Sequence, residues 1–135
     1  MARVIKMRIM IDTNVIISAM LKQGSVPDLV LNFACENCDL ILCDHIIDEC
    51  YDVADRRFSK KLSVLDDMLA KLRYELVPAP RKGEIEMRDA KDQPILNAAI
   101  AYDIDMLVTG DKHFLELEIE RPEILTPSEF LEQYV

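Results

Sequence analysis

MRIMIDTN (residues 7–14) is a short, largely apolar segment that runs directly into an aspartate, Asp12. The pattern returns at IDMLVTGD (residues 104–111), which ends at Asp111. Each segment predicts a buried strand with a carboxylate at its carboxyl end. In an open α/β sheet, that edge is where ligands bind. Acids gathered there repel one another unless a cation joins them, and a hard divalent cation is the usual partner of clustered carboxylates.

Length and composition favour one globular unit. The chain has 135 residues, half of them hydrophobic and only three of them glycine, which suits a single compact core and argues against disorder. No apolar run approaches the roughly 20 residues of a membrane span, and the first residues lack the apolar core of a signal peptide. We therefore expect a single domain, residues 1–135, in the cytoplasm.

The charge is strongly acidic but uneven. A net charge of −9 argues against simple electrostatic capture of nucleic acid. Residues 56–82, however, carry eight basic and three acidic side chains. This segment is interpreted either as an ordinary solvated helix surface or as a patch that faces phosphates beside an acidic metal site.

Four cysteines lie close together in the sequence. Cys35 and Cys38 have the spacing of a zinc knuckle, but Cys43 and Cys50 do not form the second close pair that zinc modules usually have. Free cysteines in a reducing compartment mostly behave as small core hydrophobes. Packing is therefore expected in preference to a structural zinc site.

Strands and helices are predicted to alternate along the chain. Strands are expected at residues 7–11, 40–43, 75–77, 104–109 and 124–126. Helices are expected from Thr13, from Asp28, over 44–57 with Asp44 as N-cap, over 59–74 with Ser59 as N-cap, over 92–102 and 111–117, and from Pro127. This alternation predicts an α/β fold whose mostly parallel sheet of four or five strands is covered on both faces.

The individual acids have two explanations. Asp12, Asp92 and Asp111 each precede a predicted helix, so each could be a simple N-cap. All three would share one edge of a parallel sheet, and capping is compatible with metal binding because a helix N-terminus stabilises a carboxylate. Among the acids of helix 44–57, Glu49 lies nearest the buried boundary, where it could turn toward a cleft or form an ordinary amphipathic flank.

Four segments of the chain closely resemble PIN domains: IMIDTNVIISAM, IIDECYDVADRRF, RDAKDQPILNAAIAYDIDMLVTGDKHF and ILTPSEFLEQY. The likeness is greatest to prokaryotic toxin components of toxin–antitoxin systems, akin to VapC-type toxins, and it covers nearly the whole chain from about Met7. The resemblance implies a three-layer α/β/α sandwich around a parallel sheet. It also implies a ribonuclease that depends on Mg²⁺ or Mn²⁺.

The resemblance assigns roles to particular residues. The catalytic and metal-binding acids of the family match Asp12, Glu49, Asp92 and Asp111, and the supporting polar residues match Asn14 and Thr109, with Asp89 as an ambiguous further acid. From the basic segment, we add Arg56, Arg57, Lys60 and Lys61 as weak candidates for RNA binding. His45 and His113 are candidates for acid–base work, but the favoured interpretation places each of them outside the site.

The expected function is hydrolysis of RNA phosphodiester bonds with Mg²⁺ or Mn²⁺ as cofactor. The resemblance implies a cognate antitoxin protein as partner and a homodimer or higher homo-oligomer. The alternative is a non-catalytic PIN-like module that binds RNA or protein, against which the complete set of acids argues. A phosphotransfer receiver domain is a third reading, but it requires adjacent acids after the first strand and a late lysine, which this chain lacks.

Overall fold

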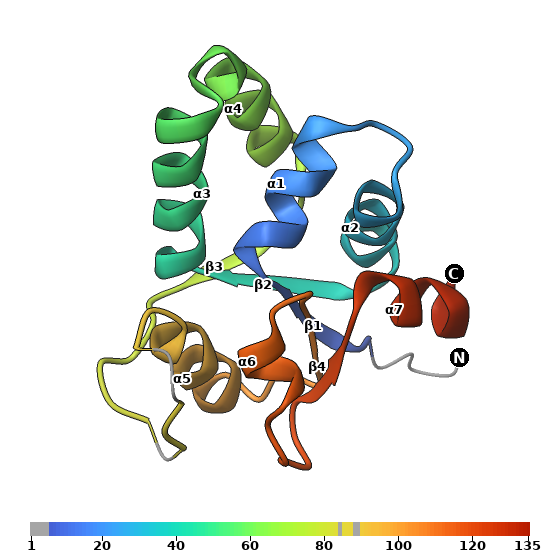
Figure 1. Cartoon of the computed structure of the whole chain (residues 1–135). Coiled ribbons are helices and arrows are strands. Elements are labelled where there is room, and N and C mark those ends of the chain that lie inside the picture. Colours follow the sequence, from blue (N-terminus) through green and yellow to red (C-terminus); the bar gives the residue numbers. More distant parts are fainter. Residues whose placement is uncertain (1–5, 84, 88–89) are drawn as a thin grey trace.

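The computed structural model describes residues 6–83, 85–87 and 90–135. Five strands alternate with helices (Figure 1). The strands are β1 (Arg8–Ile11), β2 (Asp39–Cys43), β3 (Glu75–Val77), β4 (Met106–Val108) and β5 (Glu123–Leu125). The helices are α1 (Thr13–Leu21), α2 (Val26–Asn37), α3 (Asp44–Arg57), the 3₁₀ turn η1 (Ser59–Lys61), α4 (Leu62–Lys71), α5 (Gln93–Ala101), α6 (Lys112–Leu115) and α7 (Pro127–Tyr134).

All strands are parallel, in the order β3-β2-β1-β4-β5. The chain first builds outward from β1 to β3, then returns to place β4 on the other side of β1. In the register of these two central strands, Ile11 lies beside Val108. The strand order therefore reverses between β1 and β4, and in open α/β sheets ligands bind at the carboxyl ends of the strands at such a point.

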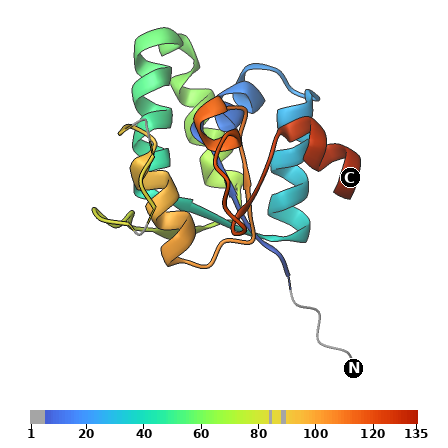
Figure 2. The ribbon, with the colours of Figure 1, turned by 60° about the horizontal axis from the view of Figure 1, so that its bottom comes forward.

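Helices cover both faces of the sheet, which confirms the predicted α/β/α sandwich. Helices α1 to α4 and α7 lie on one face, and α5 and α6 lie on the other (Figures 1 and 2). Within the first layer, α1 packs against α2 and α3, and α7 packs against α2. Helices α3 and α5 also contact each other, at the edge where the carboxyl ends of the strands lie.

The hydrophobic core explains why these segments form strands. Ile9, Met10 and Ile11 of β1 are completely buried, as are Ile41 and Leu42 of β2. A strand that is covered on both faces has no solvent side, so its sequence is a continuous apolar run and does not alternate. Such a run is the pattern that predicts these strands from the sequence.

Several helix boundaries differ from the predictions. Residues 59–74 do not form one helix, since η1 precedes α4, and the N-cap positions of η1 and α4 are Phe58 and Lys61 and not Ser59. Helix α2 begins before Asp28, because the side chain of Ser25 caps it by accepting the Asp28 N–H. Asp44 is the first residue of α3 and Cys43 occupies the N-cap position. In the part of the chain that the structure describes, no helix has the length and apolar character needed to cross a membrane.

Candidate functional site

Asp12 lies at the end of β1 and caps α1. One carboxylate oxygen, Oδ1, accepts the N–H of Thr13 at 2.7 Å, and the other, Oδ2, accepts the hydroxyl of Thr109 at 2.8 Å. Thr109 follows β4 and is fully buried, and its hydroxyl oxygen also accepts the N–H of Asp111 at 3.0 Å. One threonine therefore connects the acids that follow the two central strands.

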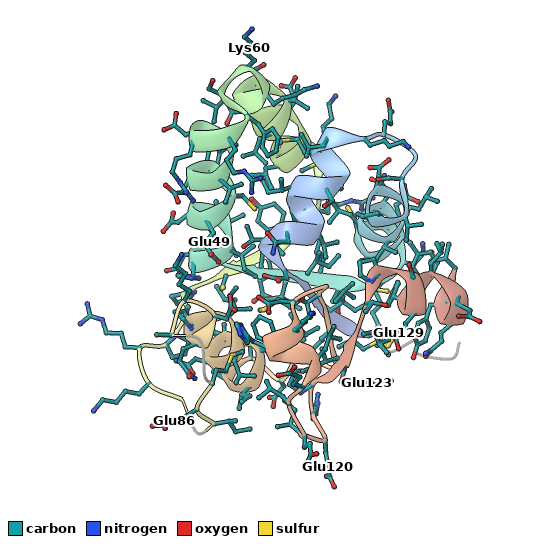
Figure 3. The ribbon with its side chains drawn as sticks, viewed as in Figure 1. Glu49, Lys60, Glu86, Glu120, Glu123 and Glu129 are labelled. Atoms are coloured by element: carbon teal, nitrogen blue, oxygen red, sulfur yellow. The ribbon has the colours of Figure 1, made fainter. Side chains whose placement is uncertain are left out.

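Glu49 reaches the same edge from helix α3 (Figure 3). Its Oε1 accepts a hydrogen bond from the hydroxyl of Thr13 at 3.2 Å and lies 3.3 Å from Nε2 of His45. The same His45 nitrogen lies 2.9 Å from the carbonyl oxygen of Lys91. Because both partners of Nε2 are acceptors, this nitrogen carries the proton and donates to them. His45 thus joins Glu49 to the chain just before Asp92.

Asp92, Asp111 and His113 form the third part of the cluster. Nδ1 of His113 lies 3.5 Å from Oδ1 of Asp111 and 4.0 Å from Oδ2 of Asp92. Asp111 caps α6, with Oδ1 accepting the N–H of His113 at 2.8 Å. Asp92 occupies the N-cap position of α5, but its side chain makes no capping hydrogen bond. The capping explanation therefore holds for Asp12 and Asp111 and is wrong for Asp92.

The surroundings of Asp12 disfavour the charged form of its carboxyl. Burial raises the pKa of its carboxyl to about 6, against the lowering effect of the hydrogen bonds from Thr109 and Thr13. The neighbouring carboxylates of Glu49 and Asp111 raise the pKa further. A buried carboxylate with like charges beside it is stabilised by any cation that binds among them.

The donor set fits a divalent cation. One ligand atom from each of Asp92, Asp111 and His113 can be chosen so that all lie within 4.8 Å of one another. Ligand atoms about 2.0–2.2 Å from one ion lie about 3–4.4 Å apart, so small side-chain rotations would place these three around a single ion. Asp12 lies beside this group, because Thr109 connects it to Asp111. The side chains of Asp111 and Glu49 remain 22% and 30% exposed, so solvent reaches the cluster.

The structure brings together Asp12, Glu49, Asp92, Asp111 and Thr109, the residues that the sequence placed at one edge of the sheet. Asn14 is exposed in the first turn of α1, and within the described residues its side chain makes no hydrogen bond. Asp89 lies outside the described residues.

The basic residues Arg56, Arg57, Lys60 and Lys61 lie at the other end of α3 and in η1. Figure 3 shows Lys60 at the tip of the α3–α4 hairpin and Glu49 toward the sheet. At 1.5 Å per residue, Arg57 lies about 12 Å along the helix axis from Glu49. Arg56 pairs with Asp52 at 2.9 Å, and the guanidinium of Arg57 lies over the ring of Phe58. A substrate would therefore have to extend along α3 to contact both the acidic cluster and these basic residues.

The interpretation that both histidines lie outside the site is wrong. His45 contacts Glu49, and His113 contacts Asp92 and Asp111. For His45 the sequence signal was the i,i+4 spacing to Glu49, which places two side chains on one face of a helix. For His113 the signal was its position in the first turn after Asp111, where the cap turns the chain back toward the acid.

The cysteines are free, and three of the four are buried. Burial raises the pKa of the Cys43 thiol to about 11 and that of Cys50 to about 12. Among the described residues, the group that could hold a metal contains no cysteine. Cys38, Cys43 and Cys50 therefore pack as small buried side chains, and Cys50, which lies close enough to Asp12 and Glu49 to feel their charge, stays protonated.

Comparison with known proteins identifies the family and the fold. The sequence profile of the PIN domain matches residues 8–113. No curated protein sequence matches the chain significantly.

Solved structures similar to this chain include the following three. A chain of the Rickettsia felis VapBC2 complex bound to promoter DNA is 22% identical with a TM-score of 0.65, over 88% of this chain and 97% of that chain. A chain of DNA-bound VapBC from Salmonella typhimurium is 17% identical with a TM-score of 0.65, over 90% and 98%. Mycobacterium tuberculosis VapC20, a toxin that cleaves the sarcin–ricin loop, is 13% identical with a TM-score of 0.55, over 82% and 98%. At these identities the comparison establishes a shared fold.

Proposed function

The chain belongs to the PIN domain family, and from this premise we propose that it is a metal-dependent ribonuclease that hydrolyses RNA phosphodiester bonds. The observation that carries the proposal is the meeting of Asp12, Glu49, Asp92 and Asp111 at the carboxyl edge of the sheet. We propose one PIN domain spanning residues 1–135. Location in the cytoplasm stays a prediction from the sequence.

Each residue of the cluster has a defined part in this proposal. Asp92 and Asp111, with Asp12 beside them, would hold Mg²⁺ or Mn²⁺. A divalent cation there would supply Lewis-acid activation of water and offset charge on the phosphate. Thr109 fixes the orientation of Asp12 through its hydroxyl, and burial keeps water away from that carboxylate.

Glu49 would orient the attacking water or hold a second metal. In the described part of the chain, both of its contacts fall on Oε1, from Thr13 and His45. Oε2 is therefore available to accept a hydrogen bond from water and to receive its proton. The exposed amide of Asn14, in the first turn of α1, can donate a hydrogen bond to a phosphate oxygen.

Cleavage of an RNA panel tests the proposal. The purified chain is incubated with each RNA in Mg²⁺, in Mn²⁺ or in chelator, beside Asp12→Asn and the control Asp67→Asn, which alters an exposed acid of α4. We expect cleavage that needs a metal, that Asp12→Asn abolishes and that Asp67→Asn retains. Full metal-dependent activity in Asp12→Asn would contradict the proposed role of Asp12 as a catalytic, metal-binding acid. RNA binding without cleavage in any metal would support the non-catalytic module instead.

We further propose that the chain is the toxin of a toxin–antitoxin pair and pairs with a cognate antitoxin and with a second copy of itself. The similar chains from Rickettsia felis and Salmonella typhimurium belong to VapBC complexes, which supports this proposal. Size-exclusion chromatography with light scattering, on the chain alone and co-expressed with a candidate antitoxin, measures both associations. A chain that elutes as a monomer and retains no co-expressed protein would contradict them.

A further inference from the structure

His113 supplies the nitrogen donor in the group that the structure places within metal-binding distance, the other two donors being the carboxylates of Asp92 and Asp111. Its Nδ1 atom, rather than Nε2, faces both acids, at 3.5 Å and 4.0 Å. These separations fall between neighbouring and opposite positions around an ion with ligands at about 2.1 Å.

The backbone of His113 holds the Asp111 carboxylate close to the imidazole. Oδ1 of Asp111 accepts the N–H of His113 at 2.8 Å, so the carboxylate and the imidazole leave the first turn of α6 side by side. Asp92 approaches from α5, and its carboxylate is not used to cap that helix. The three donors thus come from two helices and converge from different directions, as the ligands of a single ion must.

We propose that His113 is a nitrogen ligand of the cation held by Asp92 and Asp111, so that this site selects Mn²⁺ and the later first-row divalent metals over Mg²⁺. The inference rests on the proposed function in taking a divalent cation to bind at these acids. Imidazole nitrogen suits transition metals, whereas Mg²⁺ prefers oxygen donors and retains its waters. With Nδ1 facing the ion, the ring proton is on Nε2, on the 44% exposed side chain that solvent can reach.

A different role for His113 would be an ion pair with the two carboxylates, in which a protonated Nδ1 occupies the place of the metal. The two roles differ in a measurable way. An ion pair competes with metal, so removing the imidazole would strengthen metal binding. A ligand contributes to metal binding, so removing it weakens the binding of Mn²⁺ in particular.

The test uses Mn²⁺ as the probe on the chain without a histidine tag, because the chain itself has two histidines. Electron spin-echo modulation of bound Mn²⁺ detects a directly coordinated ¹⁴N nucleus. Calorimetry measures the affinities for Mn²⁺ and Mg²⁺. The variants are His113→Asn, which offers an amide oxygen in place of Nδ1, and His45→Asn, which alters the other histidine of the cluster. Circular dichroism checks that both variants are folded.

We expect ¹⁴N modulation in the wild type and in His45→Asn, and its loss in His113→Asn. His113→Asn should lower Mn²⁺ affinity at least roughly tenfold, since loss of groups outside the ligand shell already costs that much, and should change Mg²⁺ affinity less. Bound Mn²⁺ without ¹⁴N modulation in the wild type would overturn the inference and leave the proposed nuclease intact, as would modulation that only His45→Asn removes. Failure of the wild type to bind either metal would overturn both.

Discussion

The hydroxyl of Thr109, just after β4, donates a 2.8 Å hydrogen bond to Oδ2 of Asp12, at the end of β1, and joins two positions that are 97 residues apart in the sequence. The same hydroxyl accepts the N–H of Asp111. It lies in a fully buried residue, so water cannot replace it in either contact. A single hydroxyl therefore sets the relative position of two acids.

Thr109→Val tests that role. Valine keeps the shape of the side chain but leaves the buried carboxylate of Asp12 without one of its donors, so the free energy of unfolding should fall by about 1–3 kcal/mol. Urea denaturation in chelator measures the change, and calorimetry with Mn²⁺ should show weaker binding because Asp12 and Asp111 are no longer aligned. Thr109→Ser, which retains the hydroxyl, is the control and should stay close to wild type. Equal behaviour of the two variants would contradict the alignment.

Asp12 predicts a pH dependence of stability in the absence of metal. Its pKa is about 6 in the folded chain, against an ordinary value of 3.8. Between these values the folded state binds more protons than the unfolded state, so the free energy of unfolding falls as the pH rises from about 4 to 6. The difference between the two values corresponds to about 3 kcal/mol of stability lost at neutral pH.

Asp12→Asn should recover part of the stability that burial of the Asp12 charge removes. At pH 7.5 in chelator we expect an unfolding free energy about 1–2 kcal/mol above wild type, less than the whole because an amide oxygen does not replace both acceptor atoms. Near pH 4 the advantage should vanish, since the wild-type carboxyl is then protonated. Urea denaturation across this range measures it, with Asp67→Asn as the control. A gain that persists undiminished at pH 4 would show that burial of charge is not its cause.

The close packing of Gly83 against Asn97 leads to a prediction about stability. A Cβ at this position would collide with the buried carboxamide of Asn97, which donates to the carbonyl of Pro80 and accepts from Gln93. Gly83→Ala should therefore displace Asn97 and lower the free energy of unfolding by about 1–3 kcal/mol. Gly110→Ala is the matched control, because a Cβ there meets no atom within 4 Å. Thermal denaturation of both variants compares them, and equal midpoints would contradict the packing.

We expect Lys60 and Lys61 to contribute to RNA binding in a way that depends on salt concentration. Replacing both by alanine should weaken binding measured in chelator and lower the slope of log affinity against log salt by about 0.7 per lost phosphate contact. Arg56→Ala should have a smaller effect, because Asp52 already pairs with that guanidinium. Fluorescence anisotropy with a single-stranded RNA measures the three proteins. A larger loss in Arg56→Ala would place the RNA on another face of the hairpin.

The strands and the shared edge of the acids could be predicted from the sequence because buried parallel strands are continuous apolar runs. Ile9 to Ile11 and Ile41 to Leu42 lose all exposure in the folded chain. Once the strands are parallel, Asp12 and Asp111 must lie at the same edge. Glu49 could be placed because its helix has a clear buried stripe, which fixes the direction of each side chain.

The histidines and the role of the Asp92 side chain could not be predicted in the same way. The preference of aspartate for N-cap positions gives the position of Asp92 but not its hydrogen bonds, and the carboxylate does not cap α5. The contact of His45 with Lys91 depends on how the chain after β3 returns toward α3, which tertiary packing determines. The sequence favours Ser59 as a helix N-cap, but in the structure the chain passes through η1 before α4 begins, with Phe58 and Lys61 at the two N-cap positions.

The strand order has a consequence for the chain during synthesis. After β1, β2 and β3 have formed, β1 is an edge strand, and its unpaired backbone groups can pair with any other extended chain. Only when β4 and β5 have left the ribosome does β4 cover that edge, and the same event delivers Thr109 and Asp111 to Asp12. Protection of the nascent sheet from aggregation and assembly of its acidic cluster are therefore one step.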